Sequence, residues 1–249
     1  MIDMTSLMTG WLLALLRFTP LLLMPALTPF SWAPLHVRMM LLIALSWLAV
    51  GVMPQAPESS HLLLASGCSE LLIGGCYSMA VMLPMAALGL PARLLDVQAG
   101  LASASLFNPS VQSTDSLLGT LLSLAGTLVF FALGFHLLVL RSLMASARLV
   151  PLGALAHAPH LSALLGMLGS QFVLGLMVVL PVVLGLFVID LVIAFASRSM
   201  PQANIYFLAL PLKVVAVLAL LAGSLRLAPT LMSRLFTDAL VGSQAMVKG

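Results

Sequence analysis

The residue pairs that enzymes most often use for catalysis are not arranged for it in this sequence. A zinc metalloprotease helix needs two histidines with a glutamate between them, whereas His157 and His160 are closely spaced and enclose no glutamate. Ser66 lacks the flanking glycines of a nucleophile elbow and fits a small helix-packing residue better. The glycines at 74 and 75 lack the Gly-Lys-Ser/Thr ending of a phosphate-binding loop. We therefore expect no catalytic residue, no cofactor and no metal, and we expect that the protein is not an enzyme.

Four charged residues, Arg17, Glu70, Asp190 and Lys213, lie inside otherwise apolar stretches. A charge near the bilayer centre costs about 2.5 to 3.5 kcal/mol on insertion scales, so these side chains should face protein or water. Each could belong to a structural ion pair or helix-end anchor, or could line a transport path. Asp190 and Lys213 also fit the ion relay of a secondary transporter, because they occupy the last two apolar segments. The sequence alone does not pair these four residues.

The segments that carry these charges are long enough to be membrane helices. We place them at residues 7–29, 39–56, 62–92, 117–140, 161–197 and 203–230. Most reach the roughly 20 residues that a spanning helix needs. The uncharged segment 117–140 is expected to form one continuous helix, whereas four other segments contain prolines that predict kinks or breaks, namely Pro20, Pro84, Pro181 and Pro211. The pattern predicts an all-α integral membrane protein of about six long, proline-kinked apolar helices.

The composition supports a membrane protein and excludes several other classes. Hydrophobic residues make up 62% of the 249 residues and charged residues only 7%, whereas soluble domains contain roughly 25% charged residues. The ten Lys and Arg residues give a net charge of +3 and form no basic run, so we expect no nucleic-acid partner. Cys68 and Cys76 lie in an apolar stretch and are expected to be buried free thiols. Apolar segments extend from end to end, which predicts a single integral unit over residues 1–249.

Two stretches carry a resemblance to a known family. Residues 96–153 read DVQAGLASASLFNPSVQSTDSLLGTLLSLAGTLVFFALGFHLLVLRSLMASARLVPLG, and residues 201–213 read PQANIYFLALPLK. The first stretch resembles the most characteristic region of the FliR/SctT family of type III protein export gate subunits, and the second resembles its P-Q-x-N-x-F loop and P-L-K helix start. The segments 100–109 and 134–136 favour the flagellar FliR branch over the injectisome SctT branch. The matching positions of the first stretch are Gln98, Gly100, Leu101, Pro109, Gly134, His136, Leu149, Pro151 and Gly153.

The resemblance implies a fold, partners and a location. It implies a FliP-like part at residues 1–160 and a FliQ-like helical hairpin with a C-terminal tail at residues 161–249. Such a subunit is expected to form, with FliP-like and FliQ-like subunits, the pore through which unfolded export substrates cross the bacterial inner membrane at the flagellar basal body. The large export-gate protein (FlhB/FlhA-like) and membrane lipid are the other expected partners.

The resemblance also assigns roles to particular residues. It places a pore plug in the segment 102–115, where small residues permit close approach and apolar residues can dewet a narrow pore. The implied plug residues are Ser103, Leu106, Phe107, Asn108 and Pro109. Closure of the cytoplasmic mouth is assigned to Arg198, Gln202, Asn204 and Lys213. Arg17, Glu70 and Asp190 are expected to make buried polar contacts between helices. A plain loop between two helices stays open as the alternative to the plug.

Overall fold

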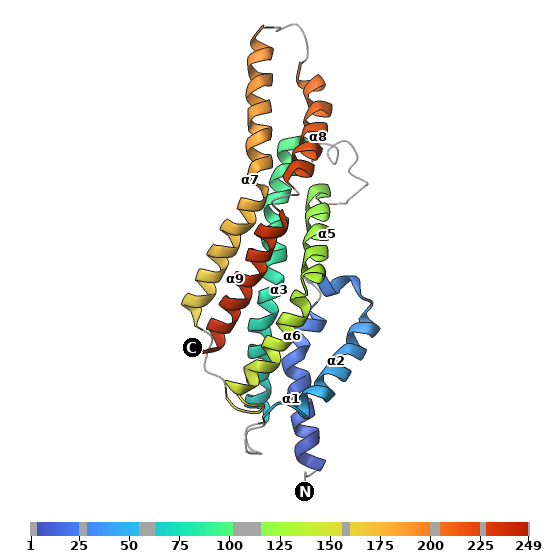
Figure 1. Cartoon of the computed structure of the whole chain (residues 1–249), viewed down its shortest axis with the longest axis vertical. Helices are drawn as coiled ribbons and strands as arrows, with labels where there is room; N and C mark the ends of the chain where they lie inside the picture. The colour runs from blue at the N-terminus through green and yellow to red at the C-terminus, as the bar shows by residue number, and fades with distance from the viewer. Residues whose placement is uncertain are drawn as a thin grey trace. The chain divides into compact units, whose positions relative to one another are not determined.

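The computed structural model describes residues 4–24, 29–54, 63–101, 116–155, 160–199, 205–224 and 228–248, and helices dominate these residues (Figure 1). Most of the helices are long and apolar, which confirms the expected all-α integral membrane fold. The α-helices are α1 (Met4–Leu23), α2 (Leu35–Val50), α3 (Leu63–Ala99), α5 (Leu117–Ala132), α6 (Phe135–Ala145), α7 (Leu161–Ser199), α8 (Ile205–Ser224) and α9 (Ala228–Lys248); the 3₁₀ turns are η1 (Pro29–Trp32) and η4 (Ser146–Arg148).

The chain folds as two compact units, each assembled from separate parts of the sequence. Unit 1 contains Met1–Met85, Phe130–Gln171 and Phe236–Gly249, and unit 2 contains Ala86–Val129 and Phe172–Leu235. Helices such as α3 and α7 contribute residues to both units. The division into residues 1–160 and 161–249 that the family resemblance implies stays a prediction.

Aromatic side chains fill much of the core of unit 1. Phe130 is fully buried, and its ring centroid lies 5.2 Å from that of Phe236. Phe135 also packs against Phe236, and their ring centroids are 5.3 Å apart. Such offset and tilted ring pairs add about 0.5 to 1.5 kcal/mol beyond the area they bury. Helices α3, α5, α6 and α9 all contribute to this core.

Close contact between α1 and α3 in unit 1 depends on a glycine. A Cβ atom at Gly74 would overlap the backbone carbonyl oxygen of Arg17. Because glycine lacks a Cβ atom, the two backbones can approach closely at this point. This contact places the residues just before Gly74 on α3 next to the middle of α1, where Arg17 lies.

Unit 2 packs the C-terminal part of α3 against α5, α7 and α8. Its core is aliphatic and includes Leu88, Leu95, Val182, Leu186 and Val217, each at most 1% exposed. These side chains recur at helical spacings along each helix, so one face of each helix is buried and the others stay free.

The expected single helix over residues 117–140 is wrong, because the structure divides it into α5 and α6. The break lies at Gly134, which has φ +71° and precedes the first residue of α6. This left-handed conformation costs glycine little, whereas a side chain would strain it. A helix that the sequence analysis did not predict as a separate element, α9, follows α8 at the C-terminal end of the chain.

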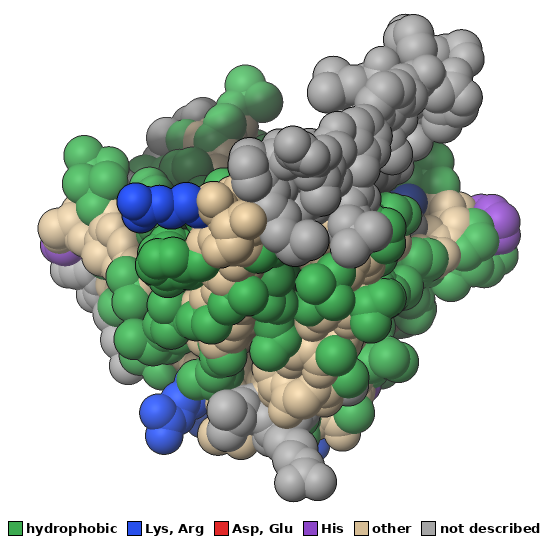
Figure 2. Space-filling model, turned by 90° about the horizontal axis from the view of Figure 1, so that it is seen from above, with side chains coloured by type: hydrophobic (Ala, Val, Ile, Leu, Met, Phe, Trp, Pro, Cys, Tyr) green, Lys and Arg blue, Asp and Glu red, His purple; other side chains and the backbone are tan. Residues whose placement is uncertain are grey.

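The described helices leave a large apolar surface exposed. Among the described residues, α1, α3 and α7 are each long and apolar enough to cross a membrane, and two bent helix pairs qualify only as pairs. Those pairs are α5 with α6, and α8 with α9. Figure 2 shows apolar side chains over much of the described surface in view, interrupted by a few Lys and Arg residues. A surface of this kind needs lipid or other proteins to cover it.

Candidate functional site

The centre of the polar structure in unit 1 is an ion pair between α1 and α3. Arg17 and Glu70 are both fully buried, and Arg17 Nε donates to Glu70 Oε2. A second bond, from Arg17 Nη2 to Glu70 Oε1, measures 3.1 Å. Two parallel bonds match the planar guanidinium to the carboxylate, which is the strongest geometry for such a pair. The arrangement joins two residues that the sequence could not pair.

The same ion pair fixes the backbone that follows η4. Arg17 Nη2 donates to the carbonyl oxygen of Val150 at 3.0 Å, and the N–H of Gly153 donates to Glu70 Oε1 at 2.9 Å. Ser66 Oγ donates to the carbonyl oxygen of Gly153 at 2.8 Å, which gives Ser66 a structural bond. Gly153 has φ +87°, so the turn requires a residue that tolerates the left-handed region. We call Arg17, Glu70 and the backbone of residues 150–153 the polar clasp.

A second ion pair lies in unit 2, between α7 and α8. Lys213 Nζ contacts Asp190 Oδ1, and the side chains are 15% and 35% exposed. Asp190, which was expected to be buried, therefore keeps about a third of its side chain accessible. A direct contact gives each charge its counter-ion where the two helices face each other. The pair therefore links α7 to α8.

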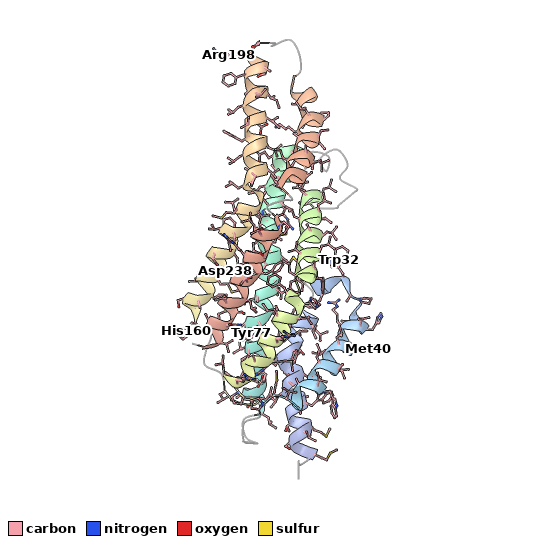
Figure 3. The ribbon with its side chains drawn as sticks, viewed as in Figure 1. Trp32, Met40, Tyr77, His160, Arg198 and Asp238 are labelled. Atoms are coloured by element: carbon pink, nitrogen blue, oxygen red, sulfur yellow. The ribbon has the colours of Figure 1, made fainter. Side chains whose placement is uncertain are left out.

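The other expected site residues fall into two groups. Arg198 lies exposed near the C-terminal end of α7, as Figure 3 shows, whereas Gln202 and Asn204 lie outside the described residues. The whole expected plug also lies outside them: Ser103, Leu106, Phe107, Asn108 and Pro109. Of the four expected mouth residues, the structure describes only Arg198 and Lys213. Lys213 contacts Asp190, which was not one of the expected mouth residues.

Asp96 connects the two described flanks of the segment 102–115. Its Oδ1 atom accepts a hydrogen bond from the N–H of Leu118 at 3.1 Å, although Asp96 belongs to α3 and Leu118 to α5. Ser116 caps the same helix end, because its Oγ accepts from the N–H of Gly119 at 2.7 Å. A carboxylate is favourable at a helix N-terminus because it satisfies free N–H groups and complements the helix dipole. The sequence analysis did not identify this role of Asp96.

A third polar cluster, also missed from the sequence, joins α7 to α9 in unit 1. Asp238 accepts hydrogen bonds from Ser170 Oγ at 2.6 Å and from Gln171 Nε2 at 3.2 Å. Figure 3 labels Asp238 on α9, facing α7. Within the described residues, no group of three or more His, Cys, Asp or Glu could hold a metal ion. The cluster links α9 to α7 through the two hydrogen bonds of Asp238.

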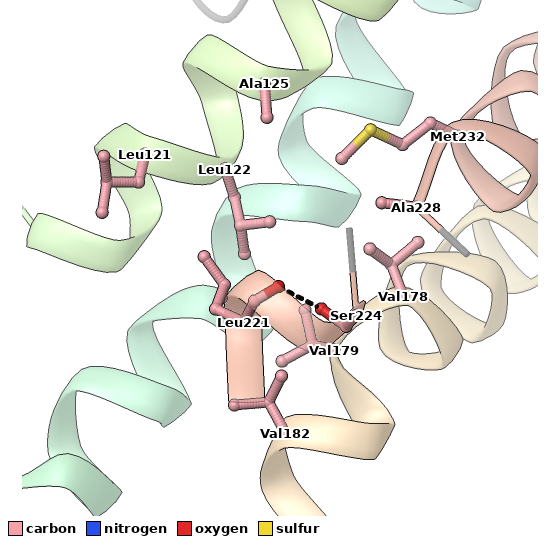
Figure 4. Close-up of a pocket in the computed structure, with 10 residues that line it drawn as sticks. All are labelled: Leu121, Leu122, Ala125, Val178, Val179, Val182, Leu221, Ser224, Ala228 and Met232. Atoms are coloured by element: carbon pink, nitrogen blue, oxygen red, sulfur yellow. Dashed lines mark hydrogen bonds between the residues drawn. The ribbon is translucent and has the colours of Figure 1, made fainter. Parts of the chain in front are cut away.

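A small cavity lies between helices of unit 2 (Figure 4). Its volume is about 30 Å³. Ser224 lies at its edge, but that hydroxyl already donates to the carbonyl oxygen of Leu221 at 2.8 Å. Apolar side chains such as Leu122, Val179 and Met232 form the rest of its wall. A cavity of this size and lining is a packing defect, too small for a substrate or cofactor.

The cysteines are free thiols, as expected, but only Cys76 is buried and Cys68 is exposed. They lie on α3, two turns apart, and neither belongs to the polar clasp. Among the described residues, ion pairs, helix caps and hydrogen bonds between helices engage Arg17, Glu70, Asp96, Asp190, Lys213 and Asp238.

Comparison with known proteins gives a consistent result over most of the chain. Residues 8–239 match the family model for bacterial export proteins, family 1. A flagellar biosynthetic protein FliR of Aquifex aeolicus is 28% identical over 209 residues, covering 82% of this chain and 81% of that protein. FliR of Escherichia coli is 25% identical and covers 82% of this chain and 80% of that protein. The secretion system apparatus protein SsaT of Salmonella typhimurium is 26% identical, with 79% of each chain covered.

Proposed function

Since the chain belongs to family 1 of the bacterial export proteins, we propose that it is a channel-forming subunit of the type III (flagellar) protein export gate. It assembles with FliP-like and FliQ-like subunits around the pore through which unfolded substrates cross the inner membrane at the flagellar basal body. The large export-gate protein (FlhB/FlhA-like) contacts this assembly. The chain carries no catalytic activity of its own in this proposal. The observation that carries the proposal is the match of nearly the whole chain to an export family.

The exposed surface of α7 supports a role inside an assembly. Within unit 2, Met177, Leu184, Phe187, Val188 and Phe195 are each between 47% and 70% exposed. Positions 184, 187, 188 and 195 share neighbouring faces of the helix, because residues three or four apart lie side by side. An apolar stripe of this length supports contact with another apolar helix or with lipid. In the proposed assembly, FliQ-like helices cover it.

The ion pair between α7 and α8 supports the FliQ-like hairpin within residues 161–249. Two antiparallel apolar helices gain little from hydrophobic burial inside a membrane, so polar contacts and close packing must join them. The contact between Lys213 and Asp190 supplies such a contact. Close packing comes from Gly185, where an added Cβ would lie 2.5 Å from a methyl carbon of Leu220. The loop at the end of this hairpin, with Arg198, Gln202 and Asn204, forms the cytoplasmic mouth in this proposal.

The finer part of the proposal is a plug formed by residues 102–115. The support comes from the flanks, because the bond from Leu118 to Asp96 brings the start of α5 back to the end of α3. A segment whose two ends are held near one another can project as a loop without moving the helices that carry it. The test is to substitute Phe107→Gly and shorten the segment 105–110, which should make resting cells leak small ions. Unchanged ion permeability would refute the plug without affecting the assembly proposal.

The assembly proposal is tested by a pull-down of the tagged chain, co-expressed with the neighbouring genes in mild detergent, followed by native mass spectrometry. We expect a discrete complex with FliP-like and FliQ-like subunits. Phe187→Lys should reduce recovery of the partners, because it places a charge on the exposed apolar stripe. Ser197→Lys, which adds the same charge at an exposed position near the end of α7, is the matched control.

A stable monomer or homodimer from the wild-type chain would refute the assembly proposal. The transporter alternative would then make a different prediction: the isolated chain should take up a small solute, and Asp190→Asn should abolish the uptake.

A further inference from the structure

Helix α2 packs on the rest of unit 1 through a narrow stripe of its surface. The buried positions of the helix are Arg38, Leu42, Ser46 and Ala49. Only Leu42 among them has a large apolar side chain, and most of the remaining positions are exposed. The helix lies beside α1 in unit 1 (Figure 1). A stripe with so few large side chains makes few dispersion contacts, so packing holds α2 weakly.

The docked position of α2 leaves hydrogen-bond donors unpaired. The Nε and Nη1 atoms of Arg38 are buried and have no hydrogen-bond partner. The same holds for Nε1 of Trp11 on α1, whose ring contacts that of Trp47 on α2 at a centroid distance of 6.3 Å. All three nitrogens are donors, and neither α1 nor α2 contains an Asp or Glu residue. A buried donor without an acceptor costs free energy, and a charged donor costs more than a neutral one.

The contact of α1 with α3 differs from its contact with α2 in both respects. Arg17 on α1 donates to Glu70 on α3 and to the carbonyl oxygen of Val150, so its charge is paired. Gly74 lets the backbones of α1 and α3 approach closely. Helix α1 is therefore fixed to α3, and of the two helices that contact α1 in this way, α2 has the weaker attachment.

Both ends of α2 are attached to unit 1 independently of the buried stripe. Before the helix, the ring of Phe30 in η1 packs edge-on against Phe130, with the centroids 5.9 Å apart. After the helix, the N–H of Leu152 donates to the carbonyl oxygen of Pro54 at 3.0 Å. No side chain caps the N-terminal end of α2, and Gly51, which follows its last residue, allows the backbone to change direction. The helix can therefore move while the segments on either side of it stay in place.

We propose that α2 is a strap that swings away from α1 while both of its ends stay attached, and that the unpaired donors of Arg38 and Trp11 poise it to open. In the open position these donors meet water or other acceptors, which removes the polar cost of docking. The helix stays folded as it moves, because its backbone hydrogen bonds are internal. Removal of the Arg38 donors should then hold the strap closed. The inference rests on unit 1 alone and does not depend on the proposed function.

Thiol labelling of a buried position on α2 measures how often the strap opens. Ser46 is fully buried, so Ser46→Cys can react with N-ethylmaleimide only when α2 leaves its docked position. Cys76, which is buried on α3 in the same unit, is the internal reference, and the exposed Cys68 is replaced by serine. In the purified full chain in detergent, we expect labelling at Ser46→Cys to be at least about tenfold faster than at Cys76. Ala49→Cys, at a second fully buried position, repeats the measurement.

The decisive comparison is Arg38→Met, which keeps a long side chain and removes the unpaired donors. It should slow labelling of Ser46→Cys by about tenfold or more, because the docked state no longer buries an unpaired charge. Labelling of Cys76 should not change. Arg141→Met, which removes an exposed arginine from α6, should change neither rate. Hydrogen exchange followed by mass spectrometry should show the same slowing at the amides of α2 but not of α3, which excludes a direct effect of the Arg38 charge on the thiol.

Three results would overturn the proposal. Equal labelling rates at Ser46→Cys and Cys76 would show that α2 does not open separately from the rest of unit 1. Unchanged labelling and exchange of α2 in Arg38→Met would show that its unpaired donors do not poise the strap. Equal slowing at Ser46→Cys and Cys76 would assign the effect to unfolding of the whole unit. Size-exclusion chromatography establishes that each variant is folded before it is labelled, and Ala49→Cys replaces Ser46→Cys if the latter does not fold.

Discussion

Replacing Arg17 by methionine should destabilise unit 1 more than any surface substitution. Arg17→Met removes both bonds to Glu70 and leaves a fully buried carboxylate with only the N–H of Gly153 as a donor. Removing one partner of a buried ion pair costs about 3 to 5 kcal/mol, because the remaining charge stays buried without compensation. Glu70→Met should cost a similar amount, since Arg17 would keep only neutral acceptors such as Val150.

The double substitution should be less harmful than the two single costs added together. With both charges removed, the loss reduces to the neutral bonds of the polar clasp, about 1 to 3 kcal/mol. The coupling energy between the two sites should then be at least about 3 kcal/mol. SDS titration of the detergent-solubilised chain, followed by tryptophan fluorescence, measures these changes in the free energy of unfolding. The probe suits the question because Trp11, Trp32 and Trp47 all belong to unit 1.

Arg141→Met is the control for loss of an arginine in the same unit. Arg141 is exposed on α6, so the free energy of unfolding should change by no more than about 0.5 kcal/mol. Additive effects of Arg17→Met and Glu70→Met would show that the two charges do not stabilise each other. Single effects no larger than that of Arg141→Met would refute the inference that the clasp stabilises unit 1.

Substitutions at Asp96, Gly134 and Gly74 test three further contacts or conformations. Asp96→Ala should lower the free energy of unfolding by about 1 to 2 kcal/mol, because it removes the acceptor for the N–H of Leu118 at the start of α5. Asp96→Asn keeps an acceptor oxygen and should cost less. A larger loss from Asp96→Asn than from Asp96→Ala would count against the cap. Gly134→Ala should destabilise the chain by about 1 kcal/mol through its φ of +71°, and Gly134→Asn by less in the same SDS titration. No atom lies within 4 Å of the added Cβ, so equal costs would contradict backbone strain as the cause. Gly74→Val should prevent α1 from packing on α3 and abolish accumulation of folded chain, measured by size-exclusion chromatography, whereas Gly75→Ala, with open space at its Cβ, should accumulate normally.

The sequence predicts the helices and their membrane character well because uniform apolar runs are a local signal. Most of the expected apolar segments correspond to helices, and the family resemblance read from residues 96–153 and 201–213 is confirmed by the comparisons. The prediction of one continuous helix over residues 117–140 failed because a glycine inside an apolar run is compatible with a continuous helix. Only the φ of Gly134 distinguishes a break from a packed helical glycine. Helix α9 was missed because it mixes polar and apolar residues and has no uniform apolar run.

The contacts of the candidate sites were less predictable because they are not local. Arg17 and Glu70 are 53 positions apart, and Asp238 lies 67 positions from Gln171. No periodicity relates such residues, so the sequence marks each charge as costly in lipid without identifying its partner. Asp96 was overlooked for the same reason, since it caps a helix that begins 21 positions after it. The plug and mouth assignments came from resemblance alone and stay predictions.

The charged residues within the apolar helices differ in whether they have a counter-ion inside their own unit. Unit 1 contains the pair of Arg17 with Glu70, and unit 2 contains the pair of Lys213 with Asp190, so each unit neutralises these charges internally. Arg38 is also buried in unit 1, but its nitrogens have no such counter-ion among the described residues. Removing one member of an internal ion pair leaves the other charge buried without a counter-ion, so it must lower the stability of the fold. Loss of an unpaired charge removes a cost, so Arg38→Gln should fold at least as well as the wild type. A stability equal to or above wild type for Arg38→Gln, beside a large loss for Arg17→Met, is therefore the expected pattern.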